Sequence, residues 1–274
     1  MDHFARLAAF SPWLFLLVLF AMMTAAREVG IWLGRRHAGD GTHEGVGVVV
    51  GSMLALLAFV LALTLSSSST RFQERRQATL TEATAISTAW ALTQAIDSAE
   101  AGRIDALMAD YTRVRRDFVA APSDPDLLAG LEMCSAGLQG QMRDLAVVVM
   151  RDQPSQLTEL LMSQLNTAFA TAATTRFAFS ARLQPQIFWL LLAMTGLSVA
   201  GLGYQLGMRG QSLRVLSALI IFMWSAVVMD ILDLGTARIG TILTDTSVYQ
   251  WLLDDLGRGA AGQGLPAECA PAPA

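Results

Sequence analysis

Four long apolar runs along the chain each approach the length that crosses a lipid bilayer. They cover residues 7–26, about 46–65, 187 to about 207, and 215 to about 234, and only the last contains charged residues. A transmembrane helix needs roughly 20 predominantly apolar residues. We therefore predict a polytopic membrane protein with four transmembrane helices.

The first run has a second interpretation, a secretory signal peptide. Arg6 precedes the run, and the small residues at 24–26 resemble a cleavage site. However, the run is long for the apolar part of a signal peptide. The sequence VGIWLG at 29–34 also continues the membrane-like character beyond the cleavage point. These features favour a transmembrane helix and leave the signal peptide as the alternative.

A helical extramembrane insert is predicted between the second and third spans, over residues 71–184. From residue 46 to about 97 there is no proline and glycine occurs only near the start, so the second span could leave the bilayer as one helix of roughly 75 Å. The serine run at 66–69 is the expected interruption. Beyond it, apolar residues recur at steps of three and four, which predicts one packed helical face. The residues of this face are Leu80, Ala83, Ile86, Ala89, Trp90 and Thr93.

Three further helices are expected in the insert, at about 103–120, 126–150 and from 154 or 155 to 183. No strand pattern is found, so the predicted fold is all-α. The predicted divisions are 1–70 for the first transmembrane pair, 71–184 for the insert, 185–236 for the second pair, and 237–274 for a C-terminal segment that is disordered from about 257.

Four spans place the insert and both termini on one side of the membrane. Near the span ends, seven arginines lie on the insert side and five on the other, so the positive-inside rule favours a cytoplasmic insert. All 19 basic residues are arginine, a bias that indicates GC-rich bacterial coding. We expect a multi-pass protein of the bacterial inner membrane.

The composition agrees with a lipid-facing surface, because 53% of the residues are hydrophobic, only 15% are charged, and the mean hydropathy is +0.45. The net charge of −4 is mild. Basic stripes interleaved with aromatic residues, which nucleic-acid-binding proteins carry, are missing, so we exclude a nucleic-acid partner.

Residue types that support catalysis are sparse. The two cysteines, Cys134 and Cys269, have no metal-ligand spacing around them, and a disulfide between them stays open. No nucleophile–base pattern or glycine-rich phosphate loop accompanies the histidines. One segment, HAGDGTHE, offers four metal-binding side chains, although we expect a solvated loop there. They are His37, Asp40, His43 and Glu44. We expect no enzymatic activity, no metal and no cofactor.

Charged residues at the edges of the spans are the candidates for function, because charge within a membrane is costly and marks ion paths or structural ion pairs. In REVGIWLGRR, Glu28, Arg35 and Arg36 follow the first span, together with Arg27. Interfacial snorkelling with local pairing is the main interpretation.

The second charged segment is RFQERRQATLTEATAISTAW, just outside the second span. Arg71, Arg75 and Arg76 lie at its start, and Glu74 and Glu82 are available partners. Glu82 stands among alanines and threonines. It is either part of a surface salt bridge or a polar group that lines a vestibule.

The third charged segment is MDILDLGTARIG, at the end of the fourth span. Asp230 and Asp233 are three residues apart, which predicts that both project from one helical face, with Arg238 about one turn beyond. The two carboxylates could line an ion path, or they could pair with arginines elsewhere and hold the helices together.

These three segments, in this order, resemble the bestrophin-like domain family of bacterial membrane proteins, over about residues 27–250. REVGIWLGRR is similar to the family's EIGYRLGRR, and LLAFVLALTLSSSSTRFQERRQATLTEATAISTAW to its LLAFTFS…RFDxRRxLVVxEANAIGTAY. ILDLGTARIGTILTD resembles its DLDRPRxGxIxVS. In this third segment the residues that match the family's motif are either Asp230 or Asp233, then Arg238 and Gly240.

Some motif positions differ from the family pattern. Thr84 and Ser87 replace the Asn and Gly of EANAIGTAY, and Leu234 and Gly235 stand where the family has Arg and Pro. A pair made by that arginine in relatives is therefore absent or rebuilt here.

The resemblance implies kinship to bestrophins, which are pentameric anion channels with cytoplasmic helical domains. It thus implies a homo-oligomeric channel with an inorganic ion as its partner, and the uncharged Ser/Thr/Ala stretches after the second span would suit a pore. The alternative is a non-conducting membrane scaffold whose helical insert binds a partner protein. Large apolar patches left on the insert would favour the scaffold.

Overall fold

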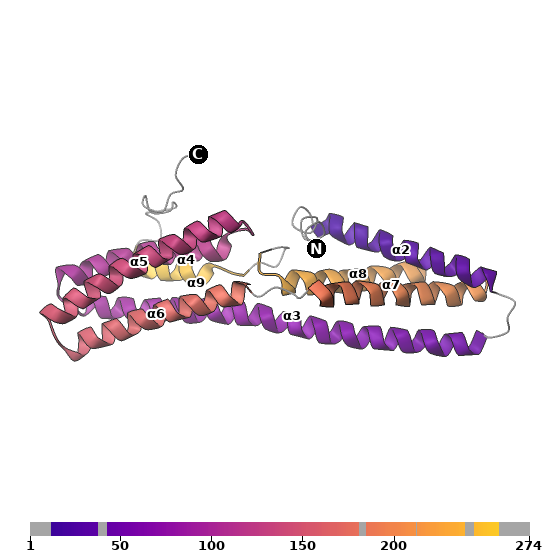
Figure 1. The fold of residues 1–274 in the computed structure, drawn as a ribbon, viewed down its shortest axis with the longest axis horizontal. Helices are drawn as coiled ribbons and strands as arrows, with labels where there is room; N and C mark the ends of the chain where they lie inside the picture. The colour runs from indigo at the N-terminus through magenta and orange to yellow at the C-terminus, as the bar shows by residue number, and fades with distance from the viewer. Residues whose placement is uncertain (1–11, 38–42, 181–184, 212, 239–243, 258–274) are drawn as a thin grey trace, which may run out of the picture. The chain divides into compact units, whose positions relative to one another are not determined.

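The computed structural model describes residues 12–37, 43–180, 185–211, 213–238 and 244–257 (Figure 1). Within these ranges every regular element is a helix, so the predicted all-α class is confirmed. The helices are α2 (Pro12–Arg36), α3 (His43–Gln94), α4 (Ala99–Ala120), α5 (Pro125–Asp152), α6 (Gln156–Ser180), α7 (Pro185–Met208), α8 (Arg214–Gly235) and α9 (Ser247–Asp255).

The chain divides into two compact units. The first, which we call the span unit, comprises residues 1–72 and 182–242, and the second, the insert unit, comprises 73–181 and 243–274. Helix α3 contributes to both. The C-terminal helix α9 belongs to the insert unit, whereas the sequence had suggested only a separate C-terminal segment. The predicted disordered tail and Cys269 lie outside the described residues.

Four helices are long and apolar enough to cross a membrane, in agreement with the four predicted spans. They include Trp13–Arg36, Gly45–Gln94, Gln186–Met208 and Arg214–Gly235. The first apolar run was predicted over residues 7–26 with helical character continuing through 29–34, and α2 does continue to Arg36. Arg27 and Glu28 form an ion pair with each other, which lowers the cost of their charge, and the helix continues through the apolar residues that follow.

Helix α3 runs without a break for 52 residues, so the interruption expected at the serine run is wrong. Serine and threonine hydroxyls can bond to the carbonyl one turn back in their own helix, which lets them sit inside it. Thr70 Oγ1 donates to the Ser66 carbonyl at 3.1 Å in this way. The predicted packed face beyond is buried at Ala83, Ile86 and Ala89, whereas Leu80 is exposed.

Helices α2 and α7 pack with their backbones in close contact. Gly30 and Gly34 on α2 face carbonyl groups of α7, and Gly203 and Gly207 on α7 face carbonyl groups of α2. A Cβ atom added at any of these four positions would clash with backbone. The two GxxxG sequences thus form a matched pair, the small-residue contact that brings membrane helices close together.

Apolar side chains complete the span unit. Leu57 and Leu61 of α3 are buried against residues of α2, α7 and α8. The other buried members of this cluster are Phe15, Leu19, Met23, Phe188, Leu191, Val199, Ile221, Val228 and Ile231.

In the insert unit, side-chain caps fix the starts of two helices. The Ser98 hydroxyl accepts a hydrogen bond from the Ala101 N–H at 3.0 Å and begins α4. The Asp124 carboxylate accepts from the Asp126 N–H at 3.0 Å and begins α5, whose first residue is Pro125. Such caps satisfy N–H groups that a helix leaves unpaired.

Helix α9 packs against α4 with its apolar side buried, and the sequence reasoning did not predict it. Tyr249, Leu252 and Leu253 form that side. Asp245 precedes the helix and accepts hydrogen bonds from the Ser247 N–H at 2.8 Å and its hydroxyl at 2.7 Å. These hydrogen bonds lower the pKa of Asp245.

Candidate functional site

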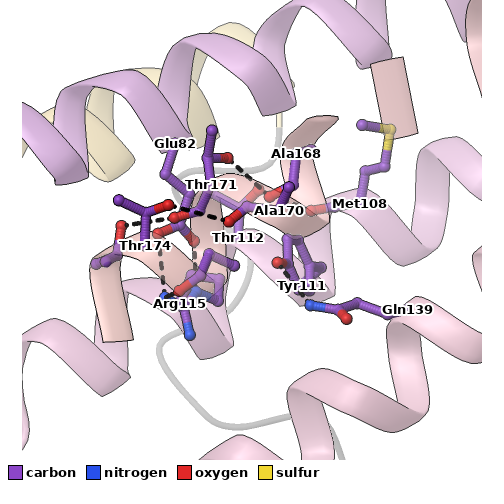
Figure 2. A network of polar contacts seen from close by, with 12 residues as sticks. Glu82, Met108, Tyr111, Thr112, Arg115, Gln139, Ala168, Ala170, Thr171 and Thr174 are labelled. Carbon is purple, nitrogen blue, oxygen red and sulfur yellow. Dashed lines mark hydrogen bonds and ion pairs between the residues drawn. The ribbon is translucent and has the colours of Figure 1, made fainter. Parts of the chain in front are cut away.

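A buried ion pair occupies the interior of the insert unit (Figure 2). Glu82 of α3 is 0% exposed, and Arg115 of α4 is 3% exposed. The guanidinium meets the carboxylate through two bonds, from Nε to Oε1 and from Nη2 to Oε2, the second at 3.0 Å. This bidentate geometry is the strongest form of an arginine–carboxylate contact.

Arg115 also joins a third helix to the pair. Its Nη2 donates to the carbonyl of Ala172 on α6 at 3.3 Å, and its guanidinium carbon lies 4.7 Å from the centre of the Phe118 ring. Burial alone would lower the pKa of Arg115, but the charge and hydrogen bonds of Glu82 raise it above the ordinary value. The arginine is therefore a permanent cation that ties α3, α4 and α6 together.

Two buried tyrosines accompany the ion pair. The Tyr111 hydroxyl accepts a hydrogen bond from Gln139 Nε2 at 3.0 Å, and its ring meets Phe169 edge to face. Burial, and then the negative charge of Glu82, raise the pKa of Tyr111 to about 12. The same two causes raise the pKa of Tyr249 on α9 well above its ordinary value.

The threonines in Figure 2 are satisfied by their own helices. Thr112, Thr171 and Thr174 donate to the carbonyls of Met108, Ala168 and Ala170 at 2.7, 2.8 and 3.3 Å. Their hydroxyls therefore already have acceptors. The arrangement is suited to fixing helices in place.

Both interpretations offered for Glu82 from the sequence need correction. A surface salt bridge would leave the carboxylate exposed, and so would a vestibule, yet the side chain is fully buried. The physical reason is Arg115, which approaches from 33 positions away along the chain. Glu74 remains exposed and is not part of this pair.

The carboxylates of the fourth span do not share one environment. Asp230 is exposed, whereas Asp233 is 6% exposed. Three residues advance an α-helix by about 300°, which is about 60° short of a full turn, so the two side chains leave neighbouring positions on the helix surface and only Asp233 turns toward the buried side. Arg238 is half-buried, and Gly240 lies outside the described residues.

The remaining candidates have mixed exposure. In α2, Arg27 is 4% exposed, whereas Glu28, Arg35 and Arg36 are exposed, and the Arg36 guanidinium carbon lies 3.7 Å from the centre of the Trp32 ring. In α3, Arg71 is half-buried, Arg75 is 1% exposed and Arg76 is exposed.

Most of the metal-binding side chains of the segment HAGDGTHE lie outside the described residues. His37 is described, and its ring Nδ1 lies 3.0 Å from the Leu33 carbonyl oxygen. Asp40 and the side chains of His43 and Glu44 lie outside the described part of the chain. Within that part, no group of three or more metal-binding side chains occurs.

Sequence reasoning missed three residues of the network, namely Arg115, Tyr111 and Tyr249. One signal was present for Arg115. Ile104, Met108, Tyr111 and Arg115 recur at steps of four, three and four along α4, and all are buried. A cation within such an apolar stripe indicates a buried partner.

The tyrosines make the insert unit sensitive to alkali. An unfolded tyrosine ionises near its ordinary pKa of 10.0, whereas folded Tyr111 ionises at about 12. Neutral Tyr111 therefore contributes fully to the free energy of unfolding below pH 10, and this contribution is lost as the pH rises toward 12. We expect tyrosinate absorbance and loss of helical circular dichroism to appear together in this interval. Tyr111→Phe should reduce this pH dependence and Tyr204→Phe, in the span unit, should not; independent ionisation of a still-folded chain would contradict the prediction.

Residues 11–236 match the family described as Bestrophin-like domain. One solved structure with this fold is a bacterial Bestrophin homolog from Klebsiella pneumoniae, with a TM-score of 0.61 and 14% identity over 89% of this chain and 97% of that chain. Another, described as a membrane protein variant, has a TM-score of 0.61 and 18% identity over the same shares. No curated protein matches the sequence. The family match confirms the resemblance stated from the motifs.

Proposed function

This chain belongs to the Bestrophin-like domain family, and from that premise we propose that it forms a homo-oligomeric channel that conducts anions. Family and fold together support an ion-channel kind of function. What we propose beyond this is that the channel selects anions, that it is a homo-oligomer, and that its ion path follows α3.

The observation that carries the proposal is the exposure of α3. In the apolar stretch of α3 that is suited to crossing a membrane, only 17% of the residues are buried within the chain. The corresponding shares are 39% for α2, 39% for α7 and 28% for α8. Val48, Val49 and Phe59 are each more than half exposed. A helix that is apolar and uncovered on most sides is suited to packing among copies of itself or against lipid, which supports an assembly built around α3.

The same helix carries an uncharged exposed face C-terminal to this apolar stretch. Between positions 77 and 88 the exposed residues are Gln77, Leu80, Thr81, Thr84 and Thr88. The hydroxyls of the three threonines bond to carbonyls of α3 itself, at 2.8 to 2.9 Å. Such side chains can border a water-filled path without presenting a fixed charge to the ion.

The proposed setting is the bacterial inner membrane, with the insert unit in the cytoplasm and no enzymatic role. This placement rests on the arginine distribution near the span ends. The bilayer and an inorganic anion are then the partners of the assembly.

A scaffold that docks a partner protein is the second candidate, and one observation favours it. Met133 and Phe177 of the insert unit are each 75% exposed, although they are large and apolar. Such residues mark contact surfaces, either between copies of the chain or with another protein.

Ion flux tests the proposal. The purified chain is first sized in detergent, then reconstituted in liposomes with opposed chloride or potassium gradients. We expect a closed oligomer that passes chloride faster than potassium. A defined oligomer without flux over a range of pH and voltage would overturn the channel and favour the scaffold.

Charge substitutions on α3 sharpen this test. Thr84→Glu should lower chloride flux several-fold and Thr84→Lys should not, because a fixed charge in a pore acts on the ion according to its sign. Thr167 of α6 is also exposed, with its hydroxyl bonded to Ser163 at 2.9 Å. Thr167→Glu and Thr167→Lys are the matched controls, and equal effects at the two positions would contradict a path along α3.

A further inference from the structure

An open apolar groove of about 540 Å³ lies in the span unit between α2, α3 and α7. This volume is within the roughly 300–1,000 Å³ typical of ligand pockets. Four of its lining residues have little or no side chain. They are Gly30, Gly45, Ala200 and Gly201. All the lining residues belong to helices apolar enough to cross a membrane, so hydrocarbon rather than water is the medium that suits this groove.

The helix ends next to the groove carry positive charge. Leu33 lines the groove on α2, and Arg35 and Arg36 follow it within one turn. Arg209 directly follows the end of α7, one turn or so beyond the lining residue Tyr204. Its Nη2 is 3.9 Å from where a Cβ on Gly47 of α3 would stand. Arginines therefore follow the lining residues at the ends of two of the helices that form the apolar space.

The charge balance at this end stays positive when the connecting segments are included. Positions 33–50 and 204–216 contain four arginines, against Asp40 and Glu44. Trp32, 53% exposed beneath the Arg36 guanidinium, adds an aromatic group of the type that membrane interfaces favour.

We propose that this groove binds an acyl chain of an anionic phospholipid, whose phosphate lies against Arg36 and Arg209. The acyl chain fills apolar space that water would not occupy favourably, and arginine matches phosphate oxygens with paired hydrogen bonds. A second copy of the chain offering an apolar helix would cover the groove but bring no anion to the arginines. An anionic lipid supplies both the apolar chain and the charge.

Native mass spectrometry of the purified full chain tests this site directly, with dioleoylphosphatidylglycerol and dioleoylphosphatidylcholine added at equal concentrations. We expect the anionic lipid to be retained preferentially. Gly201→Leu places a side chain in the groove, where the three atoms nearest to an added Cβ are side-chain atoms of Val50 and Met53, at 3.5 Å or more. Loss of contact with a few acyl methylenes should weaken retention by about tenfold. Arg209→Gln should weaken it by about fivefold for the anionic lipid alone.

A second filling variant and two controls guard against misfolding. Val49 lines the groove and is 60% exposed, so Val49→Trp fills it without disturbing a buried residue. Gly196→Leu, on α7 in open space, and Val48→Trp, at a 71% exposed position outside the groove lining, should bind lipid like the parent chain. Unchanged retention in both filling variants overturns the site. Equal retention of the two lipids overturns the charged headgroup contact. A changed oligomer mass with unchanged lipid overturns the proposal in favour of an interface between copies.

Discussion

Replacing Glu82 with alanine is expected to lower the free energy of unfolding of the insert unit by about 3–5 kcal/mol, because the substitution leaves the buried guanidinium of Arg115 without its counter-ion. Arg115 cannot relieve this by losing its proton, since arginine stays charged at any pH at which proteins fold. It must either stay buried and unpaired or reach solvent by opening the contact between α3, α4 and α6. Thermal and denaturant unfolding, followed by circular dichroism of the full chain, measures the loss.

Three further variants separate the ion pair from simple side-chain truncation. Glu74→Ala, at an exposed position on the same helix, should change stability by less than about 0.5 kcal/mol. Glu82→Gln keeps the shape but removes the charge and should remain clearly destabilising. The double variant Glu82→Met with Arg115→Met should recover much of the loss, because an apolar pair of similar volume removes both charges at once. A double variant as unstable as the single ones would contradict this account.

The second large effect is expected at the contact between α2 and α7. Gly34→Ala and Gly203→Ala should each lower the stability of the span unit by about 2 kcal/mol or more, because the new methyl group meets backbone that cannot move aside as a side chain can. Alanine is ordinarily better than glycine in a helix by roughly 0.5–1 kcal/mol. A measured loss of stability therefore reports the close backbone contact, because without that contact the alanine variants would be the more stable ones.

Glycines in open space supply the control for this prediction. Gly196 on α7 and Gly51 on α3 have no atom within 4 Å of an added Cβ. Their alanine variants should be neutral or slightly more stable in the same thermal unfolding assay in detergent. If all four variants behaved alike, the matched GxxxG contact would not be what holds α2 against α7.

The approximate positions of the helices were predictable because each depends on local features of the sequence. The apolar runs have the length of a bilayer crossing, and the prolines and aspartates near 122–126 end one insert helix and begin the next. The expectation failed at the serine run, where consecutive polar residues look disruptive in isolation. In the fold, α3 continues through it and Thr70 bonds to the turn before it.

The candidate site was only half predictable. Glu82 drew attention as an acid on an uncharged stretch, but its partner lies on another helix and no spacing rule connects positions 82 and 115. The burial of Tyr249 depends on α9 packing against α4, a contact that the sequence of a nine-residue helix does not reveal. The mutual fit of the two GxxxG sequences is likewise a three-dimensional match between α2 and α7, visible only after folding.

The shared helix α3 has a consequence for how the molecule unfolds. Its residues up to position 72 belong to the span unit and those from 73 to the insert unit, yet 52 residues form one hydrogen-bonded helix. Helix formation is cooperative, because each turn serves as the nucleus for the next. If one unit unfolds, the part of α3 that remains in the other unit ends in an uncapped, frayed turn. The two units should therefore lose structure with partly coupled transitions, unlike domains joined by a flexible linker.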